Sequence, residues 1–160
     1  MKFTNGPLAD PAEMRRIDRL VMPPLIGLIS GELTADRPRC VMGAARTSGI
    51  VTDAWISMYG CGRDDTNGLS GEVDIKINGT SIFTTKPIIR SNHSEAAAHK
   101  TTKVSGDKEI TQAAINPSAR SFVAGDVFTF DFDITRTASP TTEMSNLVVV
   151  AELEESKPIR

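Results

Sequence analysis

The sequence predicts an all-β fold, an antiparallel β-sandwich or jelly roll preceded by an N-terminal arm that contains one short helix. Three observations predict it. From Cys40 onward, apolar and polar residues alternate in short segments, and this is the period of a β-strand. Glycine, asparagine and proline separate the segments, as they do at turns. After residue 40 no helical pattern could supply the crossovers of a parallel sheet, so antiparallel pairing is expected.

The length and the charge restrict the class of protein. The 160 residues suffice for one domain with an arm. The change of pattern divides the chain into an arm (1–38), a β-sandwich (39–154) and a tail (155–160). There are 18 Lys and Arg against 20 Asp and Glu, and this formal net charge of −2 disfavours nucleic acid and membrane surfaces as partners. No apolar run approaches the length of a membrane span, so a soluble protein is expected.

The arm opens with a helix signal. Asp10 is suited to cap a first turn, Pro11 fits the first helical position, and Glu13 completes the cap. Apolar residues then recur at helical spacing until Pro23-Pro24, which is expected to end the helix. A second apolar stretch runs from Leu25 to Leu33. Such an arm should either contact another chain or cover an open end of its own domain.

The first long strand is predicted from Ile50 to Met58. Its alternation places Trp55 on one face with Val51, and Trp55 is expected in the core. Shorter strand candidates bring the total to about eight or nine. They are Arg39–Ala45, Lys86–Arg90, Lys100–Val104 and Glu109–Ile115.

A tight hairpin is the sharpest local prediction. Asn78-Gly79 separates two alternating segments, and both turn positions of such a hairpin must accept a positive φ. A two-residue turn here places Ile75 opposite Ile82.

Two later segments read as core strands. Between Val127 and Ile134, four large apolar residues share one face and three polar residues share the other, so the apolar face must be buried. The apolar four are Phe128, Phe130, Phe132 and Ile134, and the polar three are Thr129, Asp131 and Asp133. The nearly continuous valine run from Leu147 to Leu153 predicts a central strand.

The candidate chemical groups favour no catalytic or metal site. Hydrolase, nucleotide-binding and metalloprotease motifs do not occur in the sequence, so the chain is not expected to be an enzyme. His93 and His99 lie in a polar loop without nearby cysteine. The pair Asp131 and Asp133 reads as a solvated strand face, and residues 63–68 read as a turn rather than a calcium loop. No cofactor is expected.

Cysteine usage indicates a reducing site of synthesis. Cys40 and Cys61 are too few for a disulfide framework, and no secretory leader pattern opens the sequence. Both are expected to be partly buried thiols, although a single bridge between them stays open as an alternative.

Four segments then follow one another in a recognisable order. They are "SGIVTDAWISMYG", "GEVDIKINGTSIFTTKPII", "INPSARSFVAGDVFTFDFDI" and "LVVVAEL". Together, from Gly49 to Ala151, they resemble a jelly-roll-like β-sandwich module of tailed-bacteriophage virion proteins, found in head decoration (cement) proteins and in fibre proteins. The first 38 residues lie outside this resemblance.

The resemblance implies a viral structural protein. The expected role is a capsid decoration protein that is synthesised in the host cytoplasm and binds the exterior of the virion. It would bridge subunits of the major capsid protein and associate with itself as a homotrimer. The alternative is a phage fibre or receptor-binding module that recognises host surface glycans. Aromatic residues make up only 5% of the chain, and this favours decoration over glycan binding.

The residues expected to contact the capsid or a neighbouring subunit all lie in the arm. Deleting residues 1–38 is accordingly expected to abolish attachment and to leave the sandwich folded. The contact residues are Met14, Arg15, Arg16, Ile17, Arg19, Leu20, Leu25, Ile26, Leu28 and Ile29.

Overall fold

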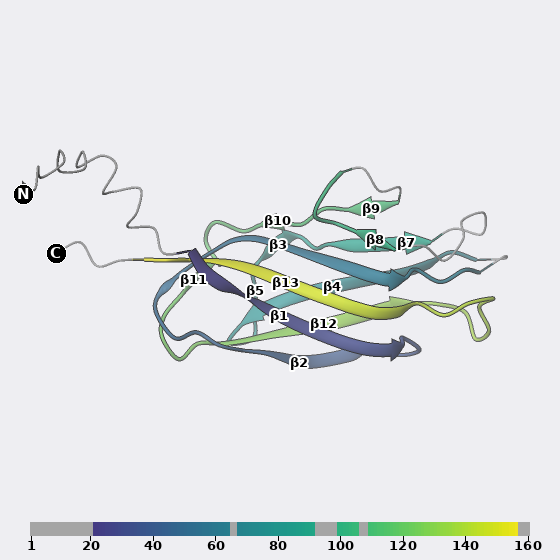
Figure 1. The fold of residues 1–160 in the computed structure, drawn as a ribbon, viewed down its shortest axis with the longest axis horizontal. Helices are drawn as coiled ribbons and strands as arrows, with labels where there is room; N and C mark the ends of the chain where they lie inside the picture. Colours follow the sequence, from purple (N-terminus) through teal and green to yellow (C-terminus); the bar gives the residue numbers. More distant parts are fainter. Residues whose placement is uncertain (1–20, 65–66, 92–98, 106–108, 157–160) are drawn as a thin grey trace, which may run out of the picture.

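The computed structural model describes residues 21–64, 67–91, 99–105 and 109–156 (Figure 1). In these ranges every regular element is a β-strand, and every strand pairing is antiparallel. The predicted all-β antiparallel class is thereby confirmed. The helix expected from Asp10 onward falls largely outside the described residues. Within them, no helix is long and apolar enough to cross a membrane.

Most strands belong to two sheets. In the first sheet the order is β1 (Val21–Glu32), β13 (Ser145–Glu155), β3 (Gly49–Gly60) and β11 (Ser121–Phe122), and β8 (Lys100–Thr101) also pairs with β3. In the second sheet the order is β2 (Arg37–Ala44), β12 (Val127–Thr135), β4 (Leu69–Ile77), β7 (Ile88–Ser91) and β9 (Ile110–Thr111), and β5 (Thr80–Ser81) pairs with β4. A separate pair joins β6 (Phe83–Thr85) to β10 (Ala114–Ile115).

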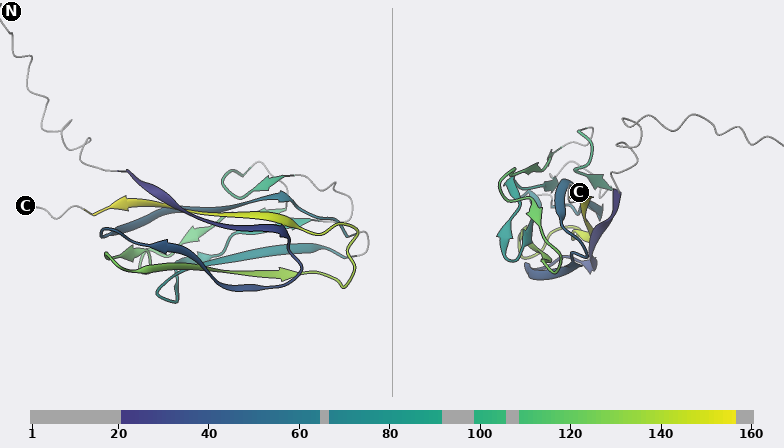
Figure 2. Two further views of the ribbon diagram at one scale, coloured as in Figure 1. Left: turned by 60° about the horizontal axis from the view of Figure 1, so that its bottom comes forward. Right: turned by 90° about the vertical axis from the view of Figure 1, so that its left-hand side faces the viewer.

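The two sheets form layers with the hydrophobic core between them (Figure 2). Phe122 of the first sheet meets Phe128 of the second edge to face, with ring centroids 5.4 Å apart. A Cβ on Gly27 of β1 would lie 2.4 Å from the Phe130 ring, so the backbone of β1 packs directly on that side chain. Only glycine permits so close an approach.

The local predictions for the hairpin and the phenylalanine strand are confirmed. Asn78 and Gly79 have φ values of 49° and 86°, and the Ile82 amide donates to the Ile75 carbonyl over 3.0 Å. Phe128, Phe130 and Phe132 are fully buried, and Ile134 at the end of β12 is half-buried. The valine run forms β13, which lies between β1 and β3 as a central strand.

The region around the predicted end of the arm differs from the division drawn from the sequence. Val21, expected in the helix, opens β1, and this strand continues through Pro23-Pro24 to Glu32. Both prolines are exposed and lie where the register of β1 shifts against β13, between Met22 and Leu25. Proline is tolerated there because β1 is an edge strand and its free side needs no amide donor. The boundary expected at residue 38 falls inside β2, so residues 21–38 contribute to both sheets.

The prediction that Trp55 belongs to the core with Val51 is wrong. Val51 is fully buried, whereas Trp55 points to the outer side of β3 and is half-buried. The reason is a β-bulge: Asp53 faces Glu152 and Val51 faces Leu153, so Thr52 is an extra residue in β3. One extra residue reverses the alternation, and the two halves of β3 are therefore out of phase.

Each shorter strand candidate overlaps an observed strand, but only Lys100–Thr101 of the candidate at 100–104 is a strand, and the candidate at 86–90 begins as a strand at Ile88. The candidate at 109–115 supplies two short strands, β9 and β10, in different sheets. Neither cysteine forms a disulfide; Cys40 is half-buried and Cys61 is buried, as the sequence predicts.

Candidate interaction surface

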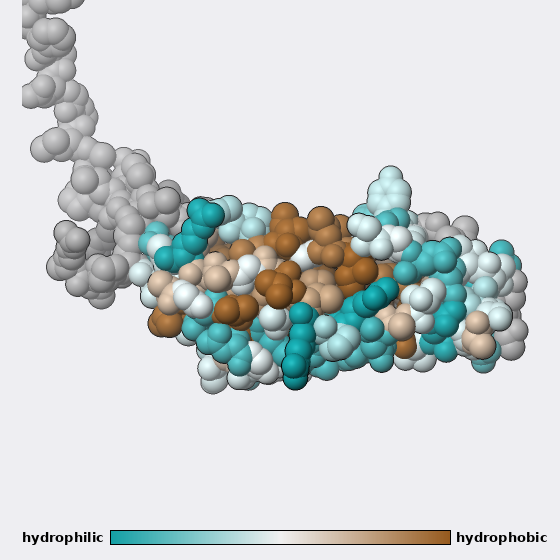
Figure 3. Space-filling view, turned by 90° about the horizontal axis from the view of Figure 1, so that it is seen from below, coloured by the Kyte–Doolittle hydropathy of each residue, from teal (hydrophilic) through white to brown (hydrophobic). Residues whose placement is uncertain are grey.

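The outer side of the first sheet carries a row of apolar side chains across three strands. Ile26 and Leu28 of β1 point away from the core and are 51% and 66% exposed. Their cross-strand partners on β13 are Val150 and Val148, and Val150 in turn faces Trp55 of β3. We call these five residues the outer apolar face. Figure 3, which looks at the side where β1 and β2 lie, shows apolar side chains gathered along the middle of the molecule between hydrophilic flanks.

A polar rim borders the outer apolar face at Trp55. The ammonium of Lys103 lies 4.0 Å from the centre of the Trp55 ring, a cation–π contact. The same ammonium is 2.6 Å from a carboxylate oxygen of Asp53 and 3.2 Å from one of Glu152. Apolar residues surrounded by charged side chains are the usual arrangement of a protein–protein interface.

The contact residues predicted from the sequence divide into three groups. Ile26 and Leu28 belong to the outer apolar face. Leu25 and Ile29, on the opposite side of β1, are half-buried against the core. The remaining six, which lie outside the described residues, are Met14, Arg15, Arg16, Ile17, Arg19 and Leu20.

Sequence reasoning misses the inner half of this surface. It places Trp55 in the core and interprets the valines of β13 only as a central strand. The signal that could identify them is that β13 is apolar at consecutive positions, which implies burial on both of its faces.

The outer side of the second sheet is different in character, because ion pairs cover it. Asp131 accepts a hydrogen bond from Lys76 over 2.6 Å and another from the Arg39 amide over 2.7 Å. Lys86 pairs with Glu72 over 2.9 Å and with Asp74 over 3.6 Å. Asp131 and Asp133 thus share a charged face, as the sequence predicts. Their pKa values move in opposite directions, because Lys76 lowers that of Asp131 and partial burial raises that of Asp133.

The Asp131 ion pair predicts a pH-dependent contribution to stability. Its pKa is held below the ordinary 3.8, so the ionised form is favoured in the folded state. The contribution is present above about pH 4 and is lost as the pH falls through the lowered pKa. We expect Asp131→Asn to be less stable than the parent protein at pH 7, and the difference should vanish in strong acid. Urea unfolding at several pH values measures it, and a difference that grows on acidification would contradict it.

In the segment 63–68, which was considered as a calcium loop, the described residues Arg63 and Asp64 are bonded to other residues of the protein. Asp64 is buried and accepts hydrogen bonds from the Asn67 amide and the Thr137 hydroxyl. Arg63 pairs with Thr142 in an isolated bridge. Among the described residues, no group of three or more His, Cys, Asp or Glu side chains is arranged to hold a metal ion. His99 is exposed beside Tyr59, and His93 lies outside the described residues.

Comparison with known proteins leaves the family open. No protein-family model and no curated protein matches the chain. Among solved structures, the chain is similar to one from Desmodium yellow mottle tymovirus, at 11% identity and a TM-score of 0.40. That alignment covers 100% of this chain and 96% of the other. A TM-score of this size is too low to carry an argument about fold or function.

Proposed function

We propose that this chain is a structural protein of a bacteriophage virion, a capsid decoration protein that attaches to the outside of the head. In this role it bridges subunits of the major capsid protein, acts as a homotrimer and performs no catalysis. In this role the two packed layers form a β-sandwich of the jelly-roll type. It combines the resemblance of residues 49–151 to virion modules with the outer apolar face, and this face is the observation that carries it.

The outer apolar face suits attachment because of where it lies. Ile26 and Leu28 sit on a strand that is hydrogen-bonded to the central strand β13, so the backbone beneath them is fixed. Side chains on a rigid sheet lose little conformational freedom when they bind. Ile26 and Leu28 are exposed beside the half-buried Val148 and the buried Val150. A contiguous apolar patch with exposed members on a folded domain is a common mark of a partner surface.

The binding free energy that one outer apolar face can supply is modest, so firm attachment requires several such faces to bind at once. Burying Ile26 and Leu28 completely would contribute roughly 3 kcal/mol per chain, about a hundredfold in affinity. A trimer that engages several capsid subunits multiplies such terms, so the assembly binds firmly although each contact is modest.

We expect the double variant Ile26→Ser, Leu28→Ser to bind undecorated heads at least about a hundredfold more weakly than the parent protein, because every chain of a trimer that is engaged loses this contact. Both side chains point to solvent in the isolated chain, so the variant should fold normally. The measurement is co-sedimentation with heads of the virus that encodes the chain, with the native mass determined alongside.

A matched control is Val104→Ser, Val123→Ser, which removes two aliphatic side chains of 54% and 59% exposure elsewhere on the surface. It should bind heads like the parent. Equal binding by both double variants would remove the outer apolar face from the proposal. If the parent ignores heads and instead binds host cells in a glycan-dependent way, the fibre or receptor-binding alternative replaces decoration.

A further inference from the structure

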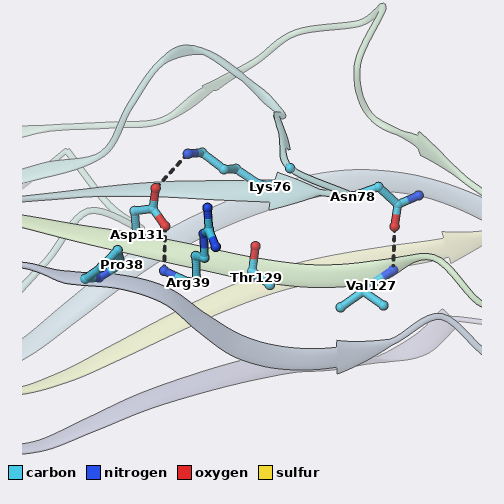
Figure 4. Close-up of a pocket in the computed structure, with 8 residues that line it drawn as sticks. Pro38, Arg39, Lys76, Asn78, Val127, Thr129 and Asp131 are labelled. Atoms are coloured by element: carbon cyan, nitrogen blue, oxygen red, sulfur yellow. Dashed lines mark hydrogen bonds and ion pairs between the residues drawn. The ribbon is translucent and has the colours of Figure 1, made fainter.

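A pocket of about 490 Å³ lies on the outer side of the second sheet, away from the outer apolar face (Figure 4). We call it the Arg39 pocket. Its floor is formed by β12 and β4, and the edge strand β2 and the Asn78-Gly79 turn border it. The residues that line it are Pro38, Arg39, Lys76, Asn78, Gly79, Val127, Thr129 and Asp131.

A β-bulge directs Arg39 into this pocket. Cys40 faces Phe130 and Arg37 faces Phe132, so the two residues Pro38 and Arg39 stand opposite Asp131 alone. Arg39 has a φ of 56°, a left-handed conformation that glycine or asparagine usually occupies. Bulges commonly turn a side chain toward a functional position. A left-handed conformation at a residue other than glycine costs free energy, and such strained residues often occur at functional sites.

Asp131 is hydrogen-bonded to both basic residues that line the pocket, to the backbone of Arg39 and to the side chain of Lys76. One of its carboxylate oxygens accepts the Arg39 amide and the other accepts the Lys76 ammonium. Both of its oxygens are thus engaged. Figure 4 shows Arg39 and Thr129 projecting from the same side of the sheet, beside the Lys76–Asp131 pair. Among the described residues, no carboxylate lies within ion-pair distance of the Arg39 guanidinium.

From this geometry we propose that the Arg39 pocket binds a single carboxylate, the acidic side chain of a protein partner. The guanidinium offers two parallel donors that match a carboxylate, and the hydroxyl-bearing Thr129 lines the same pocket. Pro38 and Val127 supply apolar walls for the adjoining part of a peptide. None of the lining residues is aromatic, so the pocket lacks a stacking platform for a sugar ring.

The charged residues in and around the pocket favour a ligand with one negative charge over a ligand with several. The lining residues sum to +1, from Arg39 and Lys76 against Asp131. Beyond them lie Asp74, at 4.0 Å from the Lys76 ammonium, and Glu72 with its partner Lys86. A phosphate dianion or a polyanion would meet these carboxylates, whereas a monocarboxylate needs only the guanidinium.

The test is an NMR titration of the ¹⁵N-labelled full chain at low ionic strength. The probes are N-acetyl-Glu-Val-amide, its uncharged Gln analogue, inorganic phosphate and N-acetylneuraminic acid. We expect the Glu peptide to shift the amide signals of Arg39 and Thr129, and the Gln analogue to bind at least tenfold more weakly. Tighter binding of phosphate or of N-acetylneuraminic acid, or equal binding of the Gln analogue, would overturn the proposal.

Substitutions at Arg39 provide the second arm. Arg39→Asn removes the guanidinium and keeps a residue that accepts the left-handed conformation, so the fold should persist. It should weaken Glu-peptide binding at least tenfold. Arg46→Gln, at an exposed arginine outside the pocket, should leave binding unchanged. Arg39→Gly serves if the asparagine variant does not fold, and unchanged binding in a folded Arg39 variant would refute the proposal. Ile26 and Leu28 lie outside the pocket, so its failure would leave the proposed attachment surface untouched.

Discussion

Replacing Phe130 by alanine should lower the free energy of unfolding by about 3–5 kcal/mol, the typical cost of removing a buried phenylalanine. The ring is 1% exposed and lies between the two sheets. Gly27 of β1 packs on it and has no side chain that could fill the space left behind. The cavity would therefore remain largely open, and this places the expected loss toward the upper end of the range. Urea unfolding, followed by circular dichroism, measures the change.

The matched control for this prediction is Val127→Ala in the same strand. Val127 is 41% exposed, so its truncation should cost less than about 1 kcal/mol. If Phe130→Ala lowered the free energy of unfolding no more than Val127→Ala does, the prediction that the Phe130 ring stabilises the packing of β1 would be wrong.

Truncation at two positions should show where the folded domain begins. Deleting residues 1–20 leaves every described strand in place, because β1 begins at Val21, so we expect the shortened protein to fold and to unfold cooperatively. Deleting residues 1–38 removes β1 and the start of β2. Leu33, fully buried, and the half-buried Leu25 and Ile29 would be lost with them, on the order of 4 kcal/mol of apolar burial.

That loss is a large part of the total stability of a domain this size, about 5–15 kcal/mol. The longer truncation should therefore be largely unfolded or aggregated, contrary to the expectation from sequence that the sandwich survives it. Thermal unfolding and size-exclusion chromatography of the two truncated chains check this. A well-folded protein lacking residues 1–38 would show that β1 is dispensable for the fold and would contradict the prediction.

The parts of the fold that depend on residues close together in the chain could be predicted from the sequence. The Asn78-Gly79 turn requires two positive φ values in succession, and the alternation from Phe128 to Ile134 fixes its own buried face. Both signals lie within one short segment. The strand β1 could not be predicted in this way, because Pro23-Pro24 usually stops a regular element. The two prolines are tolerated because β1 is an edge strand, and its position at the edge is known only once the complete sheet is known.

The candidate surface could be predicted only in part, because some of its residues are placed by local signals and others by the register between distant strands. Ile26 and Leu28 could be selected because apolar residues in an apparent arm have to contact something. Trp55 could not, because its face depends on the bulge at Thr52, and that bulge arises from the register between β3 and β13 about 100 residues apart in the chain. The strained backbone of Arg39 likewise leaves no trace in the alternation of its strand.

The pairing of Val21 with Glu154 has a mechanical consequence. The first and last described strands run side by side in opposite directions, so both ends of the fold emerge at the same pole (Figure 1). A force applied between these two ends would open the β1–β13 ladder one hydrogen bond after another, which is the weakest way to load a sheet. A force spread over the broad side of the first sheet would act on many hydrogen bonds together. A protein that must withstand tension is therefore better held by this side than by its termini.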